Sequence, residues 1–146
     1  MKAVIQRVTG ADVKIDGKIN GEISNGLMVL LGVGNGDTDK DMKYIADKII
    51  NLRIFSDEND KMNLSLKDVG GSMLVISQFT LYGDCSHGRR PYFGDAMEPV
   101  GANEMYESFV RYVKEQRIHT ETGEFGADMK VRLTNDGPVT IILESR

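Results

Sequence analysis

The stretch Asn25-Gly26-Leu27-Met28-Val29-Leu30-Leu31-Gly32 decides the fold, because its five central residues are apolar on both faces of an extended chain. A strand with one face in water alternates apolar and polar residues, whereas an uninterrupted apolar run indicates a strand covered on both sides. We therefore expect residues 27–31 to form a central strand. The Asn-Gly pair before it is a turn signal.

The residues before this strand predict more of the same sheet. Val4, Gln6 and Val8 alternate with their neighbours in the pattern of a strand, and Asp16-Gly17 is a two-residue hairpin signal. Residues 2–33 are therefore expected to be β structure.

The glycine-rich run 32–38 leads into the first predicted helix. Thr38 and Asp41 have the spacing of a capping box, and five apolar residues then recur at helical spacing. They are Met42, Ile45, Ala46, Ile49 and Ile50. The glycine spacing fits neither a dinucleotide fingerprint nor a P-loop, so a turn into a capped helix is the better interpretation.

A second strand and helix follow. Residues 73–81 predict another buried strand, and residues 85–101 have the glycine and proline content of a long surface loop. The second helix is expected to begin near Asn103. Its inner face is expected to carry Met105, Phe109, Val110 and Val113. Alternation at 129–134, a turn at 135–138 and the run 139–143 then complete the sheet.

These elements predict one domain, residues 1–146, of mixed α/β class. The sheets are expected to be curved, largely antiparallel and barrel-like, with two to three packed helices. A net charge of -4 argues against a protein that coats long nucleic acids, and no apolar run reaches the length of a membrane span. One cysteine and no apolar targeting segment lead us to expect a cytoplasmic protein.

Two polar segments are candidate sites. Cys85 and His87 lie on one loop without an evident third group to orient them, and the chain has only two histidines, so no metal site is expected. Arg89-Arg90-Pro91-Tyr92-Phe93 combines guanidinium groups with aromatic rings. This segment is either an RNA contact or a solvated loop with a ring packed beneath it.

The segment Ser77-Gln78-Phe79-Thr80-Leu81-Tyr82-Gly83 places hydrogen-bonding side chains at the end of a hydrophobic strand. By itself this pattern fits a strand that leaves the interior with its hydroxyls satisfied by the backbone. A later segment, Asn135-Asp136-Gly137-Pro138-Val139-Thr140, fits a hairpin turn with proline at a strand start and, by default, a trans bond before the proline.

Together the two segments resemble the signatures of the D-aminoacyl-tRNA deacylase family, and both are intact. The resemblance extends over essentially the whole chain. It includes Met1-Lys2-Ala3-Val4-Ile5-Gln6-Arg7-Val8, Gly88-Arg89-Arg90-Pro91 and Phe125-Gly126-Ala127-Asp128-Met129.

The resemblance implies a hydrolase that needs no metal and no organic cofactor and releases D-amino acids from the acceptor end of tRNA. It implies that a cis Gly137-Pro138 peptide enters the site of the other subunit in a homodimer and excludes L-amino acids there. Glycine fits sterically, so glycyl-tRNA is a further expected substrate. In a member of this family, Arg7 fixes the Gly-Pro segment, and Phe125, Gly126 and Met129 belong to the substrate pocket.

The catalytic group implied by the resemblance is Ser77, Gln78, Phe79 and Thr80. Phe79 and Thr80 are expected to offer main-chain N–H groups to the oxyanion, while Ser77 and Gln78 orient the ester. Thr80 is either a nucleophile or a positioning group, and we favour the second because no base is evident. Two other functions stay open: a module that binds RNA ends without hydrolysis, and an amidase or esterase for free D-amino acid derivatives.

Overall fold

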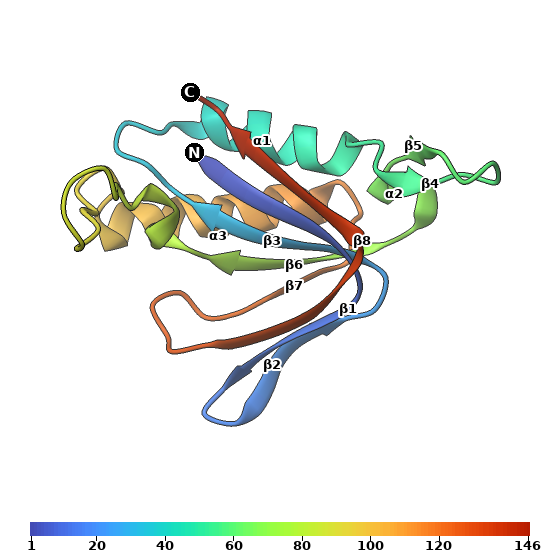
Figure 1. Ribbon diagram of the computed structural model, residues 1–146, viewed down its shortest axis with the longest axis horizontal. Coiled ribbons are helices and arrows are strands. Elements are labelled where there is room, and N and C mark those ends of the chain that lie inside the picture. Colours follow the sequence, from blue (N-terminus) through green and yellow to red (C-terminus); the bar gives the residue numbers. More distant parts are fainter.

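The computed structural model describes residues 1–146, and one curved six-stranded sheet dominates it (Figure 1). Its strands are β1 (Lys2–Ile15), β2 (Lys18–Ile23), β3 (Gly26–Gly32), β6 (Ser72–Ser77), β7 (Thr120–Thr122) and β8 (Lys130–Glu144). The helices are α1 (Asp39–Asn51), α2 (Leu66–Val69) and α3 (Pro99–Glu115), with a 3-10 helix η1 (Phe79–Tyr82). A small hairpin joins β4 (Phe55–Ser56) and β5 (Met62–Leu64).

The long, bent strand β1 is the centre of the sheet. β8 pairs antiparallel with it from Lys2 to Lys14, while the other edge of β1 pairs first with β3 and then with β2. The predicted Asp16-Gly17 turn is confirmed, because both residues have the left-handed φ values, 52° and 77°, that such a turn requires. Gly26 does not close a second hairpin. It starts β3, which pairs with β1 and not with β2.

Strand β3 is central and buried, as its apolar run predicts. It pairs antiparallel with β1 and parallel with β6, and β6 pairs parallel with β7. Leu27 and Val29 face the main core with α1 and α3, while Met28 faces a smaller cluster inside the curve of the sheet. Figure 1 shows both long helices on one side and the outer halves of β1 and β8 curling away on the other. The prediction of a mixed α/β fold with a curved, barrel-like and largely antiparallel sheet is confirmed.

Helix α1 has the predicted cap and the predicted face. The Asp41 carboxylate accepts the Thr38 N–H at 2.9 Å, and all five predicted apolar residues are buried. Helix α3 begins earlier than predicted, at Pro99 instead of Asn103, because the Glu98 carboxylate accepts the N–H groups of the first turn. The inner face is shifted accordingly, and it buries Tyr106 more fully than Met105.

Candidate active site

The extended strand β6 ends at Ser77, so the strand predicted for residues 73–81 is wrong beyond that residue. The Gln78 N–H still bonds to the Leu31 oxygen at 2.8 Å, and the chain then turns into η1, where the Gly83 N–H bonds to the Thr80 oxygen at 2.9 Å. The turn takes Phe79 and Thr80 out of the sheet. Phe79 is 56% exposed although it is a large apolar residue.

Two adjoining cavities lie at this end of β6. One, of about 280 Å³, is lined by Ile76, Ser77, Gln78, Phe79, Phe125, Gly126, Ala127, Asp128, Met129 and Val131. The other, of about 400 Å³, shares Ser77, Gln78, Phe79, Phe125 and Gly126 with the first. Six residues predicted for the site are therefore brought together. The cause is the parallel pairing of β6 with β7, which sends the segments after both strands to the same edge of the sheet.

The second cavity also contains two residues that the sequence pattern did not single out, Tyr106 and Glu98, and one from the candidate RNA-contact segment, Phe93. Tyr106 and Glu98 come from α3 and its cap, and Phe93 comes from the long loop. Burial raises the pKa of Tyr106, so its hydroxyl stays protonated. This hydroxyl donates a hydrogen bond to the main-chain oxygen of Val75 at 2.7 Å. Glu98 accepts the N–H groups of Val100 and Gly101. Tyr106 could have been found from the sequence, because its helical spacing with Phe109, Val110 and Val113 places it on the inner face of α3.

Thr80 lines neither cavity. Its hydroxyl accepts a hydrogen bond from the Gln78 amide, and no histidine, lysine or carboxylate bonds to it. A hydroxyl nucleophile needs a base within hydrogen-bond reach, and this arrangement does not supply one. The site offers polar groups that can position a substrate, without an evident nucleophile and base.

The Gly137-Pro138 segment is an outward bulge of β8, and the hairpin turn expected there is wrong. The strand pairs with β1 in the same direction on both sides of the bulge, since Thr140 opposes Gln6 and Asn135 opposes Val8. The Asn135 side chain closes the bulge by accepting the Val139 N–H at 2.9 Å. The bond between Gly137 and Pro138 is cis, as the resemblance implies.

The bulge and the cavities lie at opposite ends of β6 within one chain. Across the sheet, Asn135 opposes Val8, Val8 opposes Gly26, and Gly26 opposes Ser72, the first residue of β6. Ser77, at the other end of β6, lies five residue steps beyond Ser72, which is roughly 17 Å along a strand. Arg7, Gly137 and Pro138 therefore form a second group, away from the residues that line the cavities.

Cys85 and His87 make no hydrogen bond to each other. Cys85 is exposed, and the His87 ring bonds to the Ser86 hydroxyl at 2.8 Å. No three His, Cys, Asp or Glu side chains are grouped so that they would hold a metal ion. The glycine-rich run leads into α1 as predicted, and its Asp37 is buried. No helix is both long and apolar enough to cross a membrane.

Solved structures that share this fold include the following two. The c-Myc DNA Unwinding Element Binding Protein is 41% identical, has a TM-score of 0.95, and matches over 100% of this chain and 99% of that chain. A probable eukaryotic D-amino acid tRNA deacylase has a TM-score of 0.80 over 98% of both chains, and at 17% identity this likeness shows the fold alone. The fold is thus one that a probable deacylase shares.

The chain belongs to the D-Tyr-tRNA(Tyr) deacylase family, whose model matches residues 4–144. A protein of Clostridium botulinum (strain Alaska E43 / Type E3) named D-aminoacyl-tRNA deacylase is 61% identical, over 99% of this chain and 97% of its own length. A protein of Thermosipho africanus (strain TCF52B) with the same name is 58% identical, over 100% of this chain and 98% of its own length. The resemblance seen in the two motifs is confirmed, and the family is one of hydrolases.

Proposed function

We propose that this protein hydrolyses the ester that joins a D-amino acid to the terminal ribose of tRNA, with water as the second reactant and the free amino acid and tRNA as products. The observation that carries the proposal is the gathering of Ser77, Gln78 and Phe79 with Phe125 and Met129 around one small cavity, in a chain whose relatives are named for this activity. A tRNA substrate also favours a cytoplasmic location.

The proposed roles follow from the chemistry of an ester. An aminoacyl ester is already reactive toward water, so positioning and stabilisation of the oxyanion supply most of the catalysis. The ring of Phe125 and the thioether of Met129 form walls for the terminal adenine, while Ser77 and Gln78 orient the ester. The main-chain N–H groups of Phe79 and Thr80 stabilise the oxyanion.

In this proposal Thr80 is a positioning residue. Its hydroxyl is engaged by Gln78 and has no neighbouring base. The ribose hydroxyl next to the ester then helps to activate the attacking water, because it is the nearest polar group that the substrate itself brings. The proton released by water ends on the departing ribose oxygen, so the reaction balances without another reactant.

We further propose that the main-chain oxygens of Gly137 and Pro138 exclude L-amino acids by occupying the space their side chains need. A D-side chain points elsewhere, and glycine has none, so glycyl-tRNA is also a substrate. Exclusion by a rigid wall rejects one enantiomer without requiring a close fit to the other. The separation of roughly 17 Å along β6 supports a wall that comes from a second copy of the chain.

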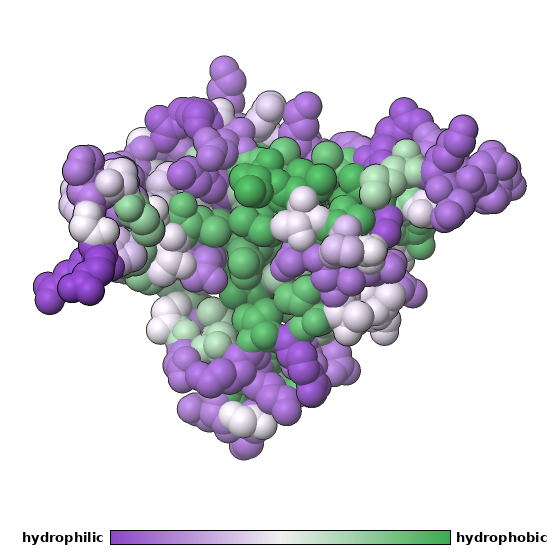
Figure 2. Space-filling model, viewed as in Figure 1, coloured by the Kyte–Doolittle hydropathy of each residue, from purple (hydrophilic) through white to green (hydrophobic).

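An apolar area on the sheet supports the homodimer. Figure 2 shows apolar side chains gathered in the middle of the face where β8, β1 and β3 lie in Figure 1. Across these strands Ile142 opposes Val4, Val4 opposes Leu30, and Leu30 opposes Ile76, which lines the smaller cavity. Ile142 is 70% exposed. A second copy on this area would cover apolar surface and stand beside the cavity.

Labelled D-tyrosyl-tRNA, L-tyrosyl-tRNA, glycyl-tRNA and a free D-tyrosine ester test the proposal together. We expect rapid release from the D-tyrosyl-tRNA and glycyl-tRNA only. Binding of tRNA without release would favour the RNA-end module, and release from the free ester would favour a D-amino acid esterase. Sedimentation that shows a fully active monomer would contradict the shared site.

A further inference from the structure

The loop of residues 85–91 presents two unpaired cations. Two main-chain bonds close it, from the Asp84 N–H to the Tyr92 oxygen at 2.8 Å and from the Tyr92 N–H to the Asp84 oxygen at 2.9 Å. Arg89 and Arg90 are exposed, and neither guanidinium has a hydrogen-bond or ion-pair partner. No carboxylate lies between Asp84 and Asp95 in the sequence, so the tip of the loop is positively charged in a protein of net charge -4.

The closed loop is attached to the wall of the larger cavity. Phe93, which follows it, packs edge-on against Phe79 with 5.2 Å between ring centroids, and both residues line that cavity. Tyr92 is 62% exposed beside them. The two cations and an exposed aromatic ring therefore lie on a segment with fixed ends that leads from the wall of the larger cavity, and this cavity adjoins the smaller one proposed for the ester and the adenine.

We propose that this loop binds the single-stranded 3′ end of tRNA just before the terminal adenosine, with Arg89 and Arg90 on its phosphates and Tyr92 stacked on a base. This inference rests on the proposed function, because it names how the same site holds the rest of its substrate. Guanidinium groups bind phosphates with two parallel hydrogen bonds, and aromatic rings stack on bases of any sequence. Such contacts position an RNA end without reading its sequence, as an enzyme for many tRNAs requires.

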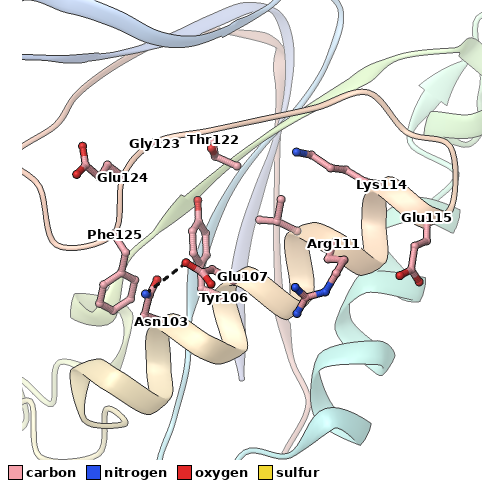
Figure 3. A pocket seen from close by; sticks show the side chains of 11 residues that line it. Asn103, Tyr106, Glu107, Arg111, Lys114, Glu115, Thr122, Gly123, Glu124 and Phe125 are labelled. Atoms are coloured by element: carbon pink, nitrogen blue, oxygen red, sulfur yellow. Dashed lines mark hydrogen bonds between the residues drawn. The ribbon is translucent and has the colours of Figure 1, made fainter.

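A groove along α3 is the competing path for the RNA, and its charge disfavours it. The groove, of about 700 Å³, also reaches Phe125 and Tyr106 (Figure 3). It carries two cations, Arg111 and Lys114, against three carboxylates, for a formal charge of 2 - 3 = -1. The carboxylates are those of Glu107, Glu115 and Glu124. Phosphates are repelled by such a lining, whereas the loop of residues 85–91 has no carboxylate.

The test compares two substrates in the double variant Arg89→Ala/Arg90→Ala. D-tyrosyl-tRNA has the upstream phosphates, whereas D-tyrosyl-adenosine has the same ester without them. We expect kcat/KM to fall at least about tenfold with tRNA, mainly through KM, and to stay within about twofold with the adenosine ester. The slope of log KM against log salt concentration should fall by about 1.4, which is 0.7 for each lost phosphate contact on a single strand.

Two further variants control for charge and shape. Lys18→Ala/Lys43→Ala removes two exposed cations in other parts of the chain, neither of which has an ion-pair partner. This variant should leave kcat/KM unchanged with both substrates. Arg89→Lys/Arg90→Lys should retain most of the salt slope because it keeps the charge. The proposal would be overturned if kcat/KM of Arg89→Ala/Arg90→Ala fell equally with both substrates, or did not fall with D-tyrosyl-tRNA.

Fluorescence anisotropy of labelled, uncharged tRNA separates this inference from the proposed function. If the wild-type protein hydrolyses neither substrate, the proposed function fails. The loop is then judged by tRNA binding alone. The affinity for tRNA should be at least about tenfold weaker in Arg89→Ala/Arg90→Ala than in the control Lys18→Ala/Lys43→Ala. Unchanged tRNA affinity would overturn the role of the loop.

Discussion

The Nε atom of Arg7 donates a hydrogen bond to the main-chain oxygen of Asp136 across 3.0 Å. The same guanidinium donates from Nη1 to the Ile54 oxygen at 2.6 Å, and its side chain is only 12% exposed. One planar group thus fixes the Gly-Pro bulge to the strand opposite it and to the segment before β4. These two contacts support the proposal that Arg7 positions the bulge.

Arg7→Lys should therefore impair selectivity as well as rate. The lysine ammonium keeps the charge but lacks the planar fork that reaches two carbonyl oxygens. We expect kcat/KM for D-tyrosyl-tRNA to fall about 10- to 100-fold, the scale expected for displacing a positioning group by about 1 Å, and the ratio of D to L hydrolysis to fall with it. Arg132→Lys is the matched control, because Arg132 binds the Asp12 side chain on the same strand pair away from the bulge. Undiminished discrimination in Arg7→Lys would exclude this role.

Removing the Thr80 hydroxyl should have a small effect on the chemical step. We expect Thr80→Val, which keeps the branched shape, and Thr80→Ala to retain single-turnover rates within about threefold, whereas loss of a true nucleophile costs on the order of 10⁶-fold. Rapid-quench measurements with saturating enzyme give these rates directly. Complete loss of hydrolysis with unchanged tRNA binding would make Thr80 the nucleophile.

Local patterns were sufficient where a single element determines its own structure. The apolar run of β3, the Asp16-Gly17 turn and the capped face of α1 are all present because each depends on neighbours in sequence. The start of α3 was misplaced because Glu98 caps the helix through a side chain that is uncommon at that position.

Patterns failed where the chain leaves the sheet. Hydrophobicity continues through Phe79 and Leu81, so it cannot distinguish a strand from the 3-10 turn that exposes Phe79. Asn135-Asp136-Gly137-Pro138 signals a break in a strand but not its direction, and the structure has a bulge there where a reversal was expected. The assembly of the cavities depends on the parallel pairing of β6 and β7, which no local motif encodes.

The capping carboxylates should make the protein less stable in acid. The main-chain N–H of Thr38 holds the pKa of Asp41 below its ordinary value of 3.8, and the main-chain N–H of Ser65 does the same for Asp68. A pKa that is lower in the folded state stabilises the fold above the unfolded value, and this contribution is lost as the pH falls through the folded pKa. We expect the free energy of unfolding to decrease below about pH 4.

Urea unfolding of Asp41→Asn between pH 7 and pH 3 tests this dependence. The variant should be less stable than the wild type at pH 7, and the two curves should converge in acid, where the wild-type carboxylate is protonated. Asp39→Asn removes a neighbouring charge of the first turn. Its free energy of unfolding should change with pH in the same way as that of the wild type. A constant difference between Asp41→Asn and the wild type at every pH would contradict the explanation.

The largest loss of stability is expected from Asp37→Asn. The buried Asp37 carboxylate accepts hydrogen bonds from the Met1 ammonium at 2.8 Å, the Gly34 N–H at 2.7 Å and the Arg146 guanidinium at 2.7 Å. Asparagine has nearly the same size but no charge, so it leaves the buried Met1 ammonium without its counter-ion. Breaking a buried pair in this way costs about 3–5 kcal/mol, and we expect the free energy of unfolding in urea to fall by that amount. Glu58→Gln, a neutralisation on an exposed loop, should change it by less than about 0.5 kcal/mol. A loss below about 1 kcal/mol in Asp37→Asn would mean that solvent reaches this ion pair and replaces the missing charge.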